Sequence, residues 1–270
     1  MKIVQSLVAA ATILVICATP ADAGETLDRV LAAGRLVNAA DEEYPPFSYR
    51  DGEGVLVGFD IEVATEVAKR FGVIVEHVTP GWDEISRGDW RGRWDVCFCS
   101  LTAEDARAAR LAVPVAYYHL QSVALVRRDD ARFNGRADFT GRRLGVQAGT
   151  IHERYLTGAA AAPAGLGAAD ILRYDTEPLA IAALLRGDGA APDAVILGRL
   201  TASEQVGDGR PLRILEPPLS AEPVVVAIAP GDPAFAAALS RIVAEMRADG
   251  TLRALSERRF GIDITAASPD

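Results

Sequence analysis

The chain has 270 residues, and half of them are hydrophobic, which is enough to bury one large core or two modest ones. Its formal net charge is −9, and its Lys and Arg residues form no run. Because nucleic-acid-binding surfaces are basic, we expect no nucleic-acid partner.

The first 23 residues have the pattern of a secretory signal peptide. Lys2 supplies the positive end, residues 3–17 form an apolar run, and Ala21-Asp22-Ala23 has the small-x-small pattern of a cleavage site. The apolar run is too short for a stable membrane span. We therefore expect cleavage after Ala23 and a mature periplasmic protein that begins at Gly24.

Two β-α series follow one another in the mature chain. The first series has predicted helices over 25–33 and 61–71 and strands over 36–39, 73–78 and 95–99. The second has strands over 121–128, 143–146, 171–174 and 194–197 and helices over 151–157 and 177–186. A strand over 224–229 and helices over 232–248 and 250–259 complete the chain. Two such series joined by extended segments predict two α/β lobes with a cleft between them.

The loop over residues 41–49 holds acidic and aromatic side chains, including Asp41 and Tyr44. Two consecutive prolines exclude regular structure from it. Binding groups collect in stiff loops that directly follow a strand, so this loop is a candidate for the binding site. The alternative is an acidic surface loop in which Tyr44 and Phe47 are packing residues.

The helix over 61–71 has a regular apolar face, and we expect Asp60 to cap its N-terminus and Gly72 to end it. A short irregular helix is predicted between Trp82 and Trp94, where the sequence is polar and interrupted by glycines.

The segment over residues 95–107 predicts a buried strand that leads directly into a helix capped by Thr102. Free backbone N–H groups at a helix start attract anions, and the hydroxyls of Ser100 and Thr102 lie beside them. Arg107, one turn later, can reach back over the turn. This combination predicts a carboxylate site. The alternative is a solvated surface arginine beside an ordinary helix cap.

Cleavage of the signal peptide would leave Cys97 and Cys99. On a strand, such a pair lies roughly 6.5 Å apart with nearly parallel Cβ vectors, which is poor disulfide geometry. His77, His119 and His152 show no metal-ligand spacing. We therefore expect free, buried thiols, no metal and no cofactor, and Cys99 is a candidate to touch a ligand.

The order of these motifs resembles the periplasmic solute-binding proteins of the amino-acid-binding family, family 3. The similarity extends over essentially the whole mature chain. It rests on Tyr44-Pro45-Pro46-Phe47, on Gly58-Phe59-Asp60-Ile61-Glu62, on Ser100-Leu101-Thr102 with Arg107, and on Gln147-Ala148-Gly149-Thr150.

The resemblance implies an α/β, two-lobe periplasmic binding protein-like fold of type II, with a ligand cleft between lobes joined by a two-segment hinge. Residues 1–23 would be the signal peptide, 24–118 and 223–270 the first lobe, and 119–222 the second.

It further implies the substrate-binding subunit of an ABC importer, a monomer that closes on an amino acid or related small carboxylate and delivers it to a membrane permease. Such a protein is not an enzyme. Two alternatives stay open: a periplasmic accessory or sensor protein, and a cyclohexadienyl dehydratase-like enzyme on the same fold.

Carried over position by position, the resemblance gives roles to individual residues. Arg107 would grip the ligand carboxylate, aided by Thr102 and the backbone near Ser100. Thr150 and the N–H groups after it would close on the same carboxylate from the second lobe.

The ligand side chain would lie between Tyr44 and Trp82. Asp41 would face its polar groups, and Cys99 stands where the family commonly has a small residue.

Two positions depart from the family pattern. Gly198 stands where the family usually has an Asp that binds the α-ammonium group of the ligand. Because a buried ammonium without a counter-charge is costly, Asp41 or another acid such as Glu177 replaces that Asp, or the ligand is not an α-amino acid. Ile151 stands where Ser or Thr is common. His152 beside it either lines the cleft or lies on the helix surface.

Overall fold

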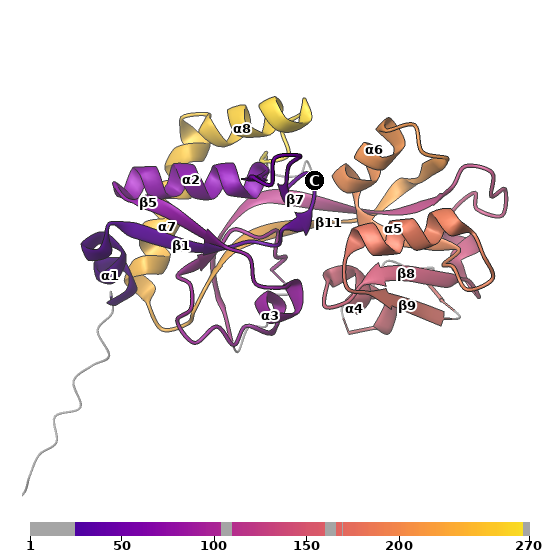
Figure 1. The fold of residues 1–270 in the computed structure, drawn as a ribbon, viewed down its shortest axis with the longest axis horizontal. Helices are drawn as coiled ribbons and strands as arrows, with labels where there is room; N and C mark the ends of the chain where they lie inside the picture. The colour runs from indigo at the N-terminus through magenta and orange to yellow at the C-terminus, as the bar shows by residue number, and fades with distance from the viewer. Residues whose placement is uncertain (1–24, 104–109, 160–165, 169, 267–270) are drawn as a thin grey trace, which may run out of the picture.

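The computed structural model describes residues 25–103, 110–159, 166–168 and 170–266. The predicted signal peptide and Arg107 lie outside these residues. Figure 1 shows two α/β lobes side by side, connected by long strands that pass from one lobe to the other. In the described part of the chain, no helix has the length and apolar character needed to cross a membrane.

One sheet runs through both lobes. Its strand order is β5-β1-β6-β11-β7-β10-β8-β9, in which β1 is parallel to β5 and β6, and β8 is parallel to β9 and β10. The strand bounds are β1 Arg35–Ala39, β5 Ile74–Val78, β6 Val96–Cys97, β7 Ala112–Arg127, β8 Arg143–Gln147, β9 Asp170–Tyr174, β10 Ala194–Gly198 and β11 Leu212–Ile228. The predicted strands therefore all exist, although β6 is shorter than expected.

Strands β7 and β11 connect the lobes as an antiparallel pair of 16 and 17 residues (Figure 1). Only the second half of β7 and the end of β11 were predicted, because polar residues such as His119 and Gln121 interrupt the apolar pattern. His119 pairs with Pro223, so the two predicted lobe boundaries lie opposite each other on these strands. The boundaries themselves remain a prediction.

A second, three-stranded sheet lies in the first lobe. It consists of β2 Glu43–Tyr44, β3 Ser48–Arg50 and β4 Leu56–Val57. The prolines do exclude regular structure, but only over the turn at positions 45–47. The backbone resumes pairing directly after them, where Ser48 faces Tyr44.

The helices of the first lobe follow the predictions closely. They are α1 Glu25–Ala33, α2 Phe59–Phe71, α3 Trp82–Arg87, α7 Pro233–Ala248 and α8 Thr251–Phe260. The predicted N-cap of α2 was wrong, because the cap is Gly58, with φ 134°. A Cβ there would lie 2.1 Å from the carbonyl oxygen of Phe47, so only glycine fits. Asp60 is instead fully buried in the first turn.

The second lobe contains α4 Ile151–Thr157, α5 Glu177–Arg186 and α6 Arg199–Gly207, with a short 3₁₀ helix at Arg136–Phe139. Thr150 caps α4, accepting a hydrogen bond from the N–H of Glu153. Helix α6 was not predicted, because its apolar residues form no regular face.

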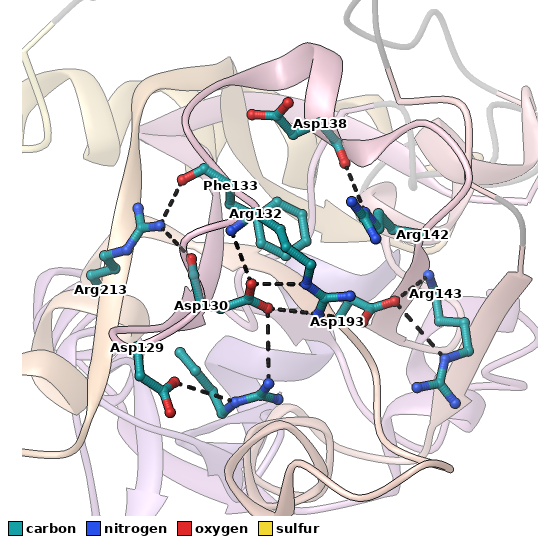
Figure 2. A network of polar contacts seen from close by, with 10 residues as sticks. Asp129, Asp130, Arg132, Phe133, Asp138, Arg142, Arg143, Asp193 and Arg213 are labelled. Atoms are coloured by element: carbon teal, nitrogen blue, oxygen red, sulfur yellow. Dashed lines mark hydrogen bonds and ion pairs between the residues drawn. The ribbon is translucent and has the colours of Figure 1, made fainter.

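A network of charged residues fastens the segment after β7 to the second lobe (Figure 2). Arg132 contacts Asp130 at 2.7 Å and Asp193 at 2.8 Å. Arg213 donates to the backbone carbonyls of Asp130 and Phe133. These contacts join β11 and the residue directly before β10 to the turn that follows β7, so they hold this end of the lobe together.

Candidate ligand-binding site

A small cavity lies between the two lobes. Eight of the ten predicted site residues line it, and four further residues complete its walls. The predicted residues are Asp41, Tyr44, Trp82, Cys99, Ser100, Thr102, Thr150 and Ile151, and the others are Leu120, Gln147, His152 and Glu177. Of the remaining two predicted residues, Arg107 lies outside the described part of the chain, and Gly198 lies directly behind the wall, next to Tyr44 and Leu120.

Ser100 has the left-handed backbone conformation, with φ 59°. Its polar groups form hydrogen bonds with residues behind the cavity wall. Its N–H donates to the hydroxyl oxygen of Tyr117 at 3.2 Å, and its own hydroxyl donates to Asp60 at 2.7 Å. The N–H of Ser100 is therefore already used by Tyr117, whereas most of the predicted helix start after Thr102 lies outside the described residues.

Cys97 and Cys99 form a disulfide, with their Cα atoms 5.3 Å apart. The prediction of free thiols was therefore wrong. It assumed strand geometry at both residues, but β6 ends at Cys97, so the chain turns before Cys99 and brings the two sulfur atoms together. Both cysteines are buried, and Cys99 lies in the cavity wall. Among the described residues, no cluster of His, Cys, Asp and Glu could hold a metal ion.

Glu177 brings a buried carboxyl to the second-lobe wall of the cavity, at the first residue of α5. Its side chain is 2% exposed, and its Oε2 atom has no hydrogen-bond partner among the described residues. Burial raises the pKa of Glu177 to about 8, although hydrogen bonds from Thr201 and from the Gly198 backbone lower it in part. The carboxyl therefore holds a proton at neutral pH until a cation binds.

Gly198 is closely surrounded by neighbouring side chains. A Cβ at position 198 would lie 2.9 Å from Leu120 and 3.1 Å from the Tyr44 hydroxyl, so a side chain there would be crowded. Glu177 reaches the same region from α5. The sequence did contain a signal for Glu177, because it is an acidic residue at a predicted helix start and position 198 lacks an acid.

His152 lies in the cavity wall and not on the helix surface. Burial lowers its pKa to about 4, so the imidazole is neutral at pH 7. Its Nε2 is 3.9 Å from Glu177, and its Nδ1 is 3.3 Å from the hydroxyl of Ser122. This neutral ring can exchange hydrogen bonds with Glu177 or with a bound molecule.

The first-lobe wall combines aromatic surface with a second carboxyl. Tyr44 stacks on Phe47 with ring centroids 5.1 Å apart. The buried Nε1 of Trp82 has no partner among the described residues, so it can donate to a ligand. Burial raises the pKa of Asp41, while hydrogen bonds from the Glu43 backbone and from Gln147 lower it.

A larger hollow at the outer end of the cavity shares Asp41 and Trp82 with it. Every charged residue that lines this hollow is acidic. They are Asp41, Glu42, Glu43, Asp83 and Asp175. Arg50 pairs with Glu42 and Arg87 pairs with Asp83, so part of the negative charge at this mouth is compensated.

The family profile described as bacterial extracellular solute-binding proteins, family 3, matches residues 36–262. The protein belongs to this family. The L-cystine-binding protein TcyJ of Escherichia coli K12 is 30% identical to it, over 88% of this chain and 87% of that protein. The L-arginine-binding protein of Pseudomonas aeruginosa PAO1 is 24% identical, over 82% of this chain and 86% of that protein.

Solved structures of the family confirm the two-lobe fold. An ancestral arginine-binding protein bound to arginine superposes with a TM-score of 0.75 and 26% identity, covering 84% of this chain and 99% of that one. An ancestral amino acid-binding protein, described as a precursor of cyclohexadienyl dehydratase, gives 0.78 and 26%, covering 87% and 99%. This family 3 protein is therefore a substrate-binding protein with the fold that the motifs predicted.

Proposed function

We propose that this protein is the periplasmic binding subunit of an ABC importer and that its ligand is an amino acid with a positively charged side chain. The observation that carries the proposal is the pair of buried carboxyls, Asp41 and Glu177, in a cavity whose described lining includes no Lys or Arg. A buried carboxyl without a cation is costly, and a dicationic ligand would relieve both.

Glu177 would bind the α-ammonium group. Its unpartnered Oε2 atom offers an acceptor. The neutral His152 can take a hydrogen bond from the same group. Proximity of an ammonium favours the ionised carboxylate, so Glu177 would lose its proton on binding.

The ligand side chain would run past Trp82 and Tyr44 toward the mouth, where Asp41 lies. Aromatic faces attract cations, and a partly desolvated contact is worth about 2 kcal/mol. Relatives whose names state arginine or histidine as their ligand fit this class better than cystine does.

The carboxylate of the ligand would lie against Ser100, Thr102 and Thr150, and Arg107 would complete that site. Closure of the lobes about β7 and β11 would create the form that a membrane permease recognises. We place the lobe boundaries at 118/119 and 222/223 and propose that the protein acts as a monomer.

One observation favours a second function. A protonated Glu177 in a closed cavity could act as a general acid, as a cyclohexadienyl dehydratase-like enzyme requires. We propose that the protein is a binder without this activity, since its relatives are named as binding proteins. Incubation with prephenate or arogenate tests this, and turnover that Glu177→Gln abolishes would establish the enzyme instead.

The decisive experiment uses the mature chain from Gly24, unfolded and refolded to remove ligand. Thermal shift and calorimetry compare arginine with citrulline, which has the same shape but no side-chain charge, and with lysine, histidine, glutamine and cystine. A ligand at 100 times its Kd adds about 2.7 kcal/mol to the free energy of unfolding, which is several degrees in Tm.

We expect arginine or lysine to bind at least tenfold more tightly than citrulline, and Asp41→Asn to remove most of that preference. Glu177→Gln should weaken every amino acid, whereas Glu76→Gln, an exposed surface change, should weaken none. Equal binding of arginine and citrulline would refute the cationic class, and no binding of any amino acid would refute the whole proposal.

A further inference from the structure

A closed ring of hydrogen bonds lies behind the cavity wall. Tyr117 donates to Oδ1 of Asp60 at 2.8 Å, and Ser100 donates to Oδ2 of Asp60 at 2.7 Å. The N–H of Ser100 returns to the hydroxyl oxygen of Tyr117, which closes the ring. Tyr118 adds a hydrogen bond of 2.7 Å to the hydroxyl oxygen of Ser100.

An irregularity in β7 brings the two tyrosine hydroxyls of this ring together. Adjacent residues on a strand normally face opposite sides, yet Tyr117 and Tyr118 both reach Ser100. The register of β7 against β11 shifts there, because Tyr118 pairs with Val224 while Ala116 pairs with Val225. This irregularity turns both hydroxyls to the same side.

The ring determines what Ser100 can offer to the cavity. A serine hydroxyl has one donor and two acceptor sites. While Asp60 is ionised, it can only accept, so the donor of Ser100 is used on Asp60 and one acceptor is used by Tyr118. Ser100 then presents only an acceptor, which suits an ammonium and not a carboxylate.

A proton on Asp60 reverses this arrangement. The protonated carboxyl donates to Ser100, whose two acceptor sites are then filled by Asp60 and Tyr118. The hydroxyl hydrogen of Ser100 is thereby released toward the cavity, where the ligand carboxylate is proposed to lie. Burial raises the pKa of Asp60 to about 7, against the lowering effect of Ser100 and Tyr117, so both forms exist near neutral pH.

We infer that Asp60 is a positioning residue whose protonation sets whether Ser100 donates to the ligand carboxylate. The inference rests on the proposed function, because it needs an amino-acid ligand. The titratable groups that act on Asp60 are Tyr117 and Tyr118 on β7, Asp41 after β1 and Tyr44 on β2. No Lys, Arg or His among the described residues forms an ion pair with it.

The test compares L-arginine with agmatine, which is the same molecule without the carboxylate. The ratio of their Kd values isolates carboxylate recognition, because the titration of Glu177 affects both amines alike. We expect the wild-type preference for arginine to fall about tenfold between pH 6 and pH 8, the usual value of one hydrogen bond to a charged group.

Two variants and one control separate positioning from simple structural support. Asp60→Asn keeps a neutral side chain that donates to Ser100 and accepts from Tyr117, so it should hold the pH 6 preference at pH 8. Ser100→Ala should show the low preference at both pH values. Ser256→Ala removes a buried hydroxyl elsewhere in the lobe and should keep the wild-type profile.

A wild-type ratio that is the same at pH 6 and pH 8 would overturn the inference. So would an Asp60→Asn variant that weakens arginine and agmatine equally at both pH values, since that marks a purely structural role. If the protein binds another amino acid instead of arginine, that amino acid and its decarboxylated amine replace the pair. Failure of every amino acid to bind refutes the proposed function, and this inference with it.

Discussion

The hydroxyl of Thr201 in the second lobe donates a 3.1 Å hydrogen bond to the carbonyl oxygen of Pro45 in the first lobe. The two residues are 156 positions apart in the sequence. Pro45 directly follows Tyr44 of the cavity wall, and Thr201 lies beside Glu177. This hydrogen bond therefore holds the two lobes together beside the cavity wall.

Loss of this bond should favour separated lobes. We expect Thr201→Val to weaken amino-acid binding about fivefold to tenfold, since a hydrogen bond contributes about 1 kcal/mol. Thr201→Ser keeps the hydroxyl and should bind like the wild type. Calorimetry measures the affinity, and small-angle X-ray scattering should show a larger radius of gyration for the valine variant. Unchanged affinity and shape in that variant would contradict this role.

Ligand binding should release a proton from Glu177. Its pKa of about 8 in the empty cavity means that the carboxyl is protonated at pH 7, and an incoming ammonium favours the ionised form. We expect close to one proton released per ligand at pH 7. Calorimetry in buffers of different ionisation enthalpy measures this number, and Glu177→Gln should reduce it. Equal release from the variant would assign the proton to another group.

The stability of the second lobe should fall in acid because of Asp130 (Figure 2). The hydrogen bond from Arg132 is the main cause that holds the pKa of Asp130 at about 2, against 3.8 in the unfolded chain. A lowered folded pKa stabilises the protein above pH 4, and this stabilisation is lost as the pH falls toward 2.

Arg132→Ala should therefore lower the free energy of unfolding at pH 7 by about 2 kcal/mol and flatten its dependence between pH 4 and pH 2. The matched control is Arg241→Ala, which removes an exposed pair with Glu245 and should cost less than about 0.5 kcal/mol. Urea unfolding at several pH values measures both. Equal losses in the two variants would show that the network adds nothing beyond a surface ion pair.

Reduction of the Cys97–Cys99 disulfide should affect binding more than folding. The bond closes a very short loop, so its removal costs about 1.5 kcal/mol or less by chain entropy. Cys99 lines the cavity and precedes Ser100, so its release should weaken ligand binding. Titration of the unfolded mature protein with a thiol reagent should find no free thiol before reduction and two after it. Two thiols in the protein as purified would rule the disulfide out.

The elements were largely predictable because their signals are local. Helix α5 begins and ends where the sequence indicated, since Glu177 follows a capping threonine and Gly187 supplies the left-handed residue that ends it. The motifs around Tyr44, Ser100 and Thr150 also identified most of the cavity wall. Periodicity, caps and turns depend on neighbours within about four residues, so one sequence contains them.

Long-range relationships were not predictable in this way. Asp60 looked like a helix cap, but the packing of α2 against β7 buries it beside Tyr117. Cys97 and Cys99 looked like one strand face, but the strand ends between them.

The sequence by itself determined the order of the elements and the family motifs, and it predicts a signal peptide. Only the tertiary structure decided that Glu177 lies buried in the cavity wall beside Gly198, that Tyr117 and Asp60 hydrogen-bond Ser100, and that a disulfide lies in the cavity wall. These features depend on the distance between segments far apart in the chain, and that distance is set by the packing of whole lobes.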